Sequence, residues 1–290
     1  MVEFDIVVIG AGHNGLTLAA YLAKAGLSVG VFEKRDVIGG GLCTEQPLFP
    51  GFLHNMHSNF HLWPDFAPAW NDLEIAKFGM KYVRPAIPWA APLSGRKSIF
   101  IHNQTRLTEK SFAKFSKKDA RTYANIKTGL DKIFKKLMLA SIYSVPTDTN
   151  PHVERLISKL PWFNQEWSGM SLFEVADELF EDETIKTFIL ANIWFAGWAP
   201  DYDKMGDLVP MFIGMCNHMY LPSGGTFQLA HTLSRIVGHY DGKIYPSCAV
   251  DKITLDVRGR ANGIILSNES KLLPEREIRA RKAVWSLLQT

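Results

Sequence analysis

The sequence predicts an α/β fold that begins with a parallel sheet, and three observations near the N-terminus predict it. A run of β-branched residues, Ile6 to Ile9, is short and apolar enough to be a strand buried on both faces. A glycine cluster follows at once, and Leu16 to Ala25 then reads as a helix that ends at Gly26. A second strand is expected over Ser28 to Phe32. This order of elements is typical of a βαβ unit.

The glycine cluster predicts a phosphate-binding turn. Gly10, Gly12 and Gly15 fit the pattern G-x-G-x-x-G. The first glycine permits a tight turn, the second allows the backbone to approach a diphosphate, and the third allows close packing of helix on sheet. The diphosphate then lies at the helix N-terminus, where free N–H groups and the helix dipole favour an anion. A glycine-rich turn without a ligand is the alternative, and the complete order of elements disfavours it.

An acidic residue at the end of the second strand indicates which nucleotide binds. Glu33 is placed to accept hydrogen bonds from both ribose hydroxyls of an adenosine. A carboxylate there would repel a 2′-phosphate, so NADP is disfavoured.

The residues after Glu33 narrow the cofactor further. Glu33, followed by Gly39-Gly40 and then Thr44, resembles the E-x-x-x-x-x-G-G-x-x-x-T pattern of FAD-dependent amine oxidases and carotenoid desaturases. That resemblance implies FAD, with these glycines letting the chain pass close to the flavin side of the cofactor.

Composition sets the broad class. The chain has 290 residues, 47% hydrophobic and 21% charged, which is ordinary for a globular protein that buries a substantial core. A net charge of +3 is too small to argue for nucleic acid. Cys43, Cys216 and Cys248 are far apart and in no metal-binding spacing, which favours free thiols in a reducing compartment. With no targeting segment visible and no apolar run of about 18 residues, a cytoplasmic location is expected.

An aromatic segment rich in Pro and His follows, over residues 47–70. His54, His57 and His61 suggest a metal, but no carboxylate or thiolate completes a zinc spacing, so no metal site is predicted. The same segment resembles the element beside the isoalloxazine in carotenoid-desaturase-like flavoproteins, which would put Ser58 and His61 near the flavin. Histidines hydrogen-bonded within an aromatic loop are the alternative.

The middle of the chain is expected to be mainly helical. Short strands over residues 81–83 and 98–101 should form a small second sheet. One long helix should follow, because apolar residues recur every three or four positions from Phe112 to Leu137. Its other face carries lysines, and such a basic helix can lie on an anionic membrane surface, although a solvated face is the commoner explanation. The lysines are Lys114, Lys117, Lys118, Lys127, Lys132, Lys135 and Lys136.

Two further helices have clear start signals. Ser171 and Glu174 form a capping box, so a helix should run from Leu172 through Phe180. Acidic residues at 181–183 favour a second helix over residues 184–194. The bulky run at 193–198, IWFAGW, suits either a lipophilic pocket or ordinary core packing.

The chain then returns to the first pattern. Residues 220–237 resemble the P-x-G-G element by which this flavoprotein class re-enters its nucleotide-binding domain, with a turn at Pro222, Gly224 and Gly225 and a helix after it. Strands are expected over residues 243–245 and 277–285, and an antiparallel pair over 249–257 and 261–267.

The resemblance also implies a set of cofactor contacts. In the family, a valine at the start of the strand after the P-x-G-G helix holds the adenine through its backbone, and Val250 occupies that place here. A plain strand residue is the alternative for Val250. The full set of expected FAD-binding residues is Gly10, Gly12, His13, Asn14, Gly15, Glu33, Lys34, Gly40, Gly41, Leu42 and Val250.

Nearly the whole chain resembles the N-terminal part of phytoene-desaturase-like FAD oxidoreductases. Family members continue beyond the strand at 283–285 with a segment that contacts the flavin. The chain is therefore expected to be a fragment, a truncated product, or one subunit whose partner supplies the remainder.

The resemblance implies a discontinuous, Rossmann-like FAD-binding domain of the glutathione-reductase type over residues 1–65 and 220–290. A mainly helical substrate domain with a few strands is inserted at 66–219. The expected chemistry is hydride transfer from a lipophilic or unsaturated substrate to flavin N5. No catalytic base is assigned. The alternatives are a non-catalytic FAD- or nucleotide-binding subunit, by analogy with the Rab GDP-dissociation inhibitor, and an NAD-dependent dehydrogenase, which the glycine motifs disfavour.

Overall fold

The computed structural model describes residues 2–145, 150–199, 201, 204–267 and 277–286. The chain divides into two compact units. The first unit comprises residues 1–61, 68–83 and 221–290, and the second comprises residues 62–67 and 84–220. The first unit is therefore discontinuous in sequence.

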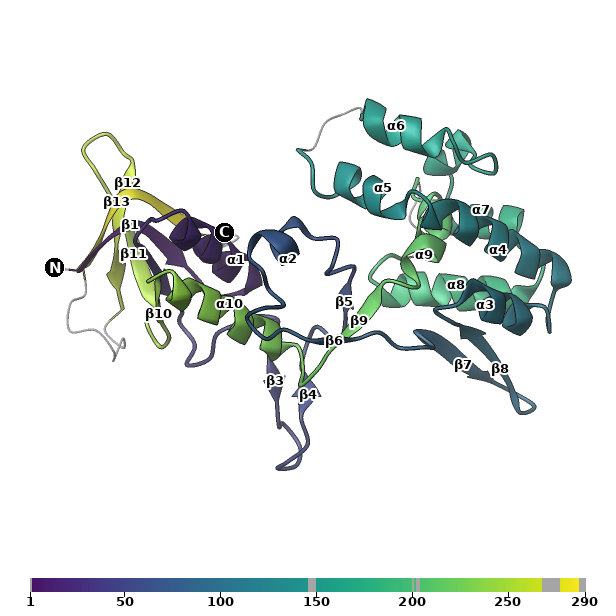
Figure 1. The fold of residues 1–290 in the computed structure, drawn as a ribbon, viewed down its shortest axis with the longest axis horizontal. Coiled ribbons are helices and arrows are strands. Elements are labelled where there is room, and N and C mark those ends of the chain that lie inside the picture. Colours follow the sequence, from purple (N-terminus) through teal and green to yellow (C-terminus); the bar gives the residue numbers. More distant parts are fainter. Residues whose placement is uncertain (1, 146–149, 200, 202–203, 268–276, 287–290) are drawn as a thin grey trace. The chain divides into compact units, whose positions relative to one another are not determined.

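A six-stranded mixed sheet organises the first unit (Figure 1). In sheet order the strands are β10 (Lys243–Tyr245), β2 (Val29–Phe32), β1 (Val2–Ile9), β13 (Glu277–Ser286), β12 (Ala261–Leu266) and β11 (Val250–Leu255). The first four run parallel, and β12 and β11 continue the sheet in antiparallel fashion. This arrangement confirms the predicted α/β class and the strands predicted in the first and last parts of the chain.

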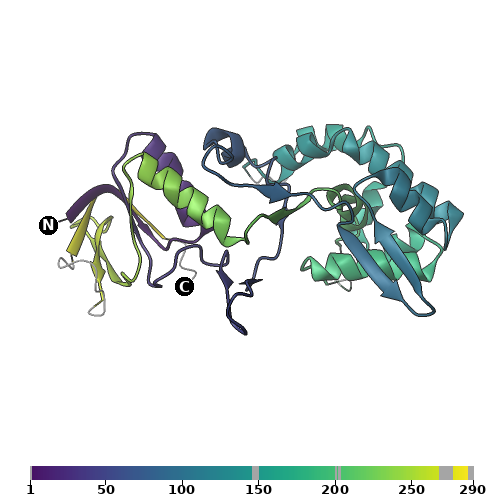
Figure 2. The same ribbon diagram turned by 60° about the horizontal axis from the view of Figure 1, so that its bottom comes forward.

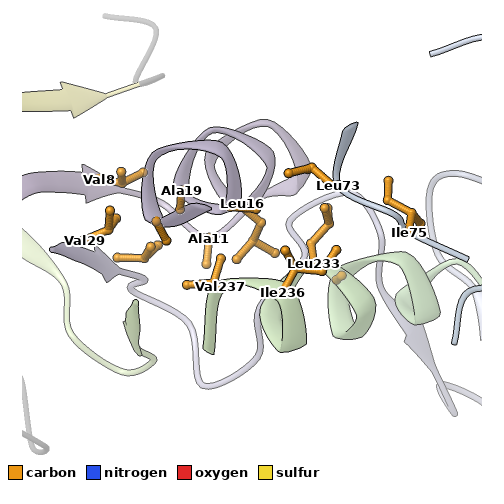
Figure 3. Packing of buried hydrophobic residues seen from close by; sticks show 14 of the residues in the cluster. Val8, Ala11, Leu16, Ala19, Val29, Leu73, Ile75, Leu233, Ile236 and Val237 are labelled. Carbon is orange, nitrogen blue, oxygen red and sulfur yellow. The ribbon is translucent and has the colours of Figure 1, made fainter. Parts of the chain in front are cut away.

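Two helices cover one face of this sheet, α1 (His13–Lys24) and α10 (Phe227–His239) (Figure 2). Figure 3 shows Leu16 of α1 between that helix and Leu233 and Ile236 of α10, and Ala19 and Val8 belong to the same apolar cluster. The opposite face of β1 is buried in a second apolar cluster. Strand β1 is thus buried on both faces, as its β-branched sequence predicted.

Helix α1 starts earlier than predicted. It begins at His13 rather than Leu16, because Gly12 already has the extended backbone of an N-cap. It ends at Lys24, just before Gly26, whose φ of +84° is a left-handed conformation that favours glycine.

The chain also forms several short elements. They are β3 (Thr44–Glu45), β4 (His54–Asn55), β5 (His61–Leu62), α2 (Pro68–Asp72), β6 (Tyr82–Val83), β7 (Trp89–Leu93), β8 (Lys97–Ile101) and β9 (Met219–Pro222). β6 pairs with β9 through Tyr82 and Val83, whereas β7 pairs with β8 in a separate hairpin. The prediction of one small sheet for residues 81–101 was therefore wrong, because the proline within β7 concealed that strand in the sequence.

The second unit is mainly helical, as predicted. Its helices are α3 (Thr105–Phe112), α4 (Lys117–Asp131), α5 (Phe134–Ser141), α6 (Pro151–Ile157), the 3-10 helix η1 (Gln165–Gly169), α7 (Leu172–Leu179), α8 (Glu183–Phe195) and α9 (Leu208–Met215).

The single long helix predicted from Phe112 to Leu137 was wrong. The chain forms α3, α4 and α5 instead, because Ser116 starts a new helix by accepting a hydrogen bond from Asp119 N at 3.1 Å. Apolar spacing continues through both breaks, so periodicity alone could not locate them.

The predicted lysine face is not exposed along its whole length. Six of its seven lysines are exposed, but Lys127 is fully buried and pairs with Asp131. A helix that packs against other helices on more than one side buries part of its polar stripe. No helix within the described ranges is long and apolar enough to cross a membrane.

The capping box of α7 is confirmed, with Ser171 and Glu174 bonded reciprocally. In the aromatic run after it, Ile193 is buried whereas Trp194 and Phe195 are mostly exposed, so the run is not simply core. Helix α9 was not predicted, because its side chains are apolar nearly all round and show no helical period.

Candidate functional site

The site lies where β1 and β2 end. Gly10 leaves β1 with a φ of +93°, and its N–H donates to the carbonyl of Phe32 at the end of β2 at 2.7 Å. A side chain at Gly15 would place its Cβ 2.2 Å from the carbonyl oxygen of Gly10. The first and third glycines therefore form the tight turn and the close helix packing that the motif predicted.

Gly12, the second glycine, faces open space. A Cβ on Gly12 would meet no atom within 4 Å, and as N-cap of α1 it offers no side chain to the first N–H groups of the helix. Gly41 is equally open. These two positions leave room for a ligand beside the N–H donors and the positive end of the helix dipole, as a diphosphate requires.

Glu33 occupies the end of β2 and is only 8% exposed. Its Oε2 accepts a hydrogen bond from Ala11 N at 2.8 Å, and its Oε1 accepts one from Arg35 N at 3.0 Å. A carboxylate has about four acceptor positions, so both oxygens remain able to accept from further donors. The backbone thus fixes this carboxylate beside the glycine turn.

A second glycine loop lies against the first. Gly39 forms a parallel β-bridge with Gly12, and its N–H donates to Ala11 O at 2.7 Å. Gly39 and Gly40 have φ values of +107° and +56°. The two glycine motifs, which α1 and β2 separate in the sequence, are thereby joined into one structure.

The P-x-G-G segment, with Pro222, Gly224 and Gly225, packs against this second loop. Thr44 Oγ1 accepts a hydrogen bond from Phe227 N, at the start of α10, at 3.1 Å. A Cβ on Gly225 would lie 2.5 Å from the same Thr44 oxygen. The threonine and the glycine that the sequence patterns singled out separately are thus in direct contact.

Asn55 is an organising residue that the sequence patterns missed. Its Oδ1 accepts hydrogen bonds from Thr44 Oγ1 at 2.9 Å and from Thr226 N at 3.0 Å. Its position opposite Thr44 in the β3–β4 pair brings it there, and no spacing rule in the sequence signals that register. Asn55 connects the glycine loop to the start of α10.

Val250 follows a segment that crosses the end of β2. Glu33 N donates to Tyr245 O at 2.9 Å, and Cys248 N donates to Glu33 O at 2.8 Å. Val250 then begins β11 opposite Leu266, with its side chain against the apolar cluster on that face. The segment between β10 and β11 therefore brings Val250 to the same end of the sheet as Glu33.

The remaining expected contact residues differ in exposure. His13 and Asn14 in the first turn of α1, and Lys34 after β2, are exposed. The side chain of Leu42 is buried in the core, so a ligand could meet only its backbone. Partial desolvation of the His13 ring lowers its pKa from the usual value.

The histidines after the glycine loop do not assemble a metal site. Over the described ranges of the chain, no group of three or more His, Cys, Asp or Glu could hold a metal ion. His61 Nδ1 instead lies 2.6 Å from the hydroxyl of Tyr82. Burial, aided by the charge of His13, lowers the pKa of His61 to about 4. Ser58 Oγ donates to Phe60 O at 3.3 Å.

Part of the chain matches a known family of nucleotide-binding domains. Residues 8–73, which contain both glycine loops and Glu33, match a family described as an NAD(P)-binding Rossmann-like domain. Together with the sheet order, this match confirms the Rossmann-like fold predicted for this part of the chain.

Two curated relatives match most of the chain. One subunit of the limonene dehydrogenase of Castellaniella defragrans is 29% identical over 238 residues, which are 80% of this chain and 42% of that protein. Pyridine nucleotide-disulfide oxidoreductase domain-containing protein 2 of Rattus norvegicus is 26% identical over 306 residues, 91% of this chain and 51% of that protein. The chain thus spans about half the length of the curated relatives it matches.

Solved structures share the fold at low identity. Rab GDI from Plasmodium falciparum superposes with a TM-score of 0.59 at 12% identity, covering 98% of this chain and 65% of that one. A putrescine oxidase variant from a redesign of cofactor binding gives 0.58 at 16% identity, covering 97% and 57%.

Proposed function

We propose that the chain binds FAD and belongs to an FAD-dependent oxidoreductase. The observation that carries this proposal is the joining of the two glycine loops by the Gly12–Gly39 bridge, with Glu33 fixed beside them. That arrangement provides an anion site at a helix N-terminus and a ribose acceptor next to it, as one bound nucleotide requires.

Several of the expected contact residues have a defined physical role in this proposal. The N–H groups at the start of α1, beside Gly12, would bind the diphosphate, and Glu33 would accept from the ribose hydroxyls. The backbone near Val250 would hold the adenine, and the open position of Gly41, next to Gly40, would let the cofactor continue toward the flavin. The remaining expected contacts to FAD are His13, Asn14, Lys34 and the backbone of Leu42.

When bound, FAD would supply the redox step, accepting a hydride from the substrate. The chain's own residues bind and orient the cofactor, and none is assigned as a base. The name of one curated relative, a limonene dehydrogenase subunit, supports a small organic substrate, and we propose a lipophilic or unsaturated one.

The limonene dehydrogenase relative is named as a subunit, which supports action within an assembly in which another chain takes part. A non-catalytic nucleotide-binding subunit is the second candidate function. The side chains of Cys43, Cys216 and Cys248 are buried. The cytoplasmic location expected from the sequence belongs to this proposal.

The test is reconstitution of the purified protein with FAD. We expect a yellow protein with an oxidised-flavin absorption spectrum. In Glu33→Ala the affinity for FAD should fall about tenfold or more, because a charge-assisted ribose contact is lost. Glu45→Ala removes an exposed carboxylate of the same unit that pairs with Arg35, and it should leave the affinity unchanged.

The flavin spectrum distinguishes an oxidoreductase from a non-catalytic nucleotide-binding subunit. Bleaching of the flavin by a lipophilic substrate supports the oxidoreductase. A stable yellow protein that no substrate bleaches favours the non-catalytic subunit, and a colourless protein that does not take up FAD overturns both.

A further inference from the structure

One stretch of the second unit has a strong excess of positive charge. Residues 105–145, which form α3, α4 and α5, contain ten Lys or Arg and three Asp or Glu, a net charge of +7 with histidine neutral. The whole chain has a net charge of +3, so the rest of it carries −4. This asymmetry indicates a partner of negative charge.

These basic side chains are available at the surface. All but the buried Lys127 are exposed. Among the described residues, only Lys118 and Lys127 of this set form ion pairs, with Glu181 and Asp131. Asp131 is the one exposed acid of the stretch, and the other two are half-buried or buried, so little negative charge offsets the rest. The exposed basic residues are Arg106, Lys110, Lys114, Lys117, Lys118, Arg121, Lys132, Lys135 and Lys136.

Helix α5 has a buried side and an outward side. Its buried residues are Phe134, Leu137 and Met138. The outward side begins with Lys135 and Lys136, which are exposed and follow Lys132 at the C-cap of α4. Helix α6 packs on α5 and adds the exposed Glu154 and Arg155, whose charges cancel. The start of α5 therefore keeps its positive charge.

The outward side becomes apolar toward the end of the helix. Ile142 is 52% exposed, Tyr143 is 39% exposed, and Val145 is 81% exposed. Ile142 N still donates to Met138 O at 2.9 Å, so the helical geometry extends to this residue. Ile142 follows Lys135 by seven residues, or about two turns, and lies on the same side of the helix. Lysines and large apolar side chains thus share one surface.

This combination favours a lipid surface over other anionic partners. Lysines are attracted to anionic headgroups, and apolar side chains beside them enter the boundary of the acyl chains. A nucleic-acid backbone would attract the lysines but would leave Ile142 and Val145 in water. Three partly exposed apolar side chains are also too few for the core of a stable protein interface, which buries about 800 Å² on each partner.

We propose that the end of α4 and the outward side of α5 dock on the surface of an anionic lipid bilayer. Lys132, Lys135 and Lys136 lie at the headgroups, and Ile142 and Val145 enter the boundary beneath them. The contact is peripheral. It lies wholly within the second unit and does not depend on the proposed FAD site.

Sedimentation of the full chain with lipid vesicles tests this proposal. The vesicles contain phosphatidylcholine alone or with about a third of phosphatidylglycerol, at low salt. We expect at least about tenfold tighter binding to the anionic vesicles, and loss of this preference in about 0.5 M salt, which screens the headgroup charge. Double-stranded DNA at the same phosphate concentration should not release the chain from the vesicles.

Charge variants locate the contact. A variant that combines Lys132→Gln, Lys135→Gln and Lys136→Gln should bind anionic vesicles at least about tenfold more weakly, because each lysine near the headgroups contributes about fivefold. The control removes the same charge at exposed positions outside the surface and should bind as wild type does. It combines Lys97→Gln, Lys243→Gln and Lys252→Gln.

Apolar variants separate lipid insertion from simple charge attraction. Ile142→Ser with Val145→Ser keeps every charge and should weaken binding to anionic vesicles about tenfold, because less apolar area leaves water. Leu255→Ser with Val257→Ser changes two exposed apolar residues of the first unit and should leave binding unchanged. Circular dichroism confirms that each variant is folded.

The proposal has clear contrary results. Absence of binding to any vesicle, equal binding to neutral and anionic vesicles at low salt, or release of the chain by DNA each overturns it. Equal binding by the wild type and by either variant of the surface does so as well.

Discussion

Individual glycines in the first unit have separable roles in the fold and in the proposed binding of the ligand. Gly15 is needed by the fold, because a Cβ there would collide with the Gly10 carbonyl. Gly12 is different, since its φ of −70° suits any residue and a Cβ would meet nothing. The sequence motif treats the two alike, and the structure distinguishes them.

This distinction predicts opposite effects of two alanine substitutions. Gly12→Ala should leave the stability of the ligand-free protein within about 0.5 kcal/mol of wild type while lowering the affinity for FAD at least tenfold, because the methyl occupies the space of the diphosphate. Gly15→Ala should lower stability by more than about 1 kcal/mol through overpacking. Urea unfolding and FAD titration measure the two effects. Unchanged FAD affinity in a folded Gly12→Ala protein would contradict the assignment of the diphosphate site.

The lowered pKa of His61 should make the stability of the folded chain depend on pH. Its pKa is about 4 in the folded chain against an ordinary value of 6.5, so the unfolded chain binds the proton first as the pH falls. The contribution of His61 is therefore fully present above pH 6.5 and is lost progressively toward pH 4. The urea midpoint should fall over this range, and less steeply in His61→Gln. An identical slope in the variant would show that His61 is not buried as described.

At the scale of elements, the first unit is held together by how its loops dock rather than by any one motif. Thr44, Asn55 and Thr226 connect the second glycine loop to the N-terminus of α10. Thr226 is fully buried, so its N–H depends on Asn55 for a partner.

Removal of the Asn55 acceptor should destabilise the contact between the second glycine loop and the start of α10. Asn55→Leu keeps a side chain of similar size but leaves Thr226 N unpaired, which should cost about 1–3 kcal/mol of stability. Because the second glycine loop is then held less firmly, the affinity for FAD should fall as well. Gln46→Leu, at an exposed position of the same hairpin, serves as the control. Stability equal to wild type in Asn55→Leu would show that this network does not hold the loop.

The second unit shows where element prediction fails. Helix α4 begins at a local cap, Ser116 with Asp119 N, but the apolar spacing continues across it and hides the break. The carboxylate of Asp119, in the first turn of α4, is fully buried and accepts hydrogen bonds from the N–H groups of Glu181 and Asp182. These two donors are far away in sequence, so no local pattern could reveal this contact. The capping box of Ser171 with Glu174 was sufficient to predict the start of α7, because both partners are local in sequence.

At the scale of the whole molecule, the sequence predicted the first unit better than the second. Glycines, β-branched strands and Glu33 act through backbone geometry, which a short pattern encodes, and each was found in its expected place. The contact of Asn55 with Thr226 and the burial of Lys127 arise from the tertiary arrangement and leave no signal in spacing.

The proposed site accounts for the adenosine and diphosphate of a nucleotide within one unit of the chain. Both glycine loops, Glu33 and Val250 belong to this unit. We therefore predict that the site recognises the AMP part of FAD, which FMN lacks.

Titration of the purified chain with FAD and with FMN, followed by quenching of flavin fluorescence, tests this claim most directly. We expect FAD to bind, ADP to compete with it, and FMN to bind at least about tenfold more weakly. Binding of FMN as tight as that of FAD, or failure of ADP to compete, would contradict the account.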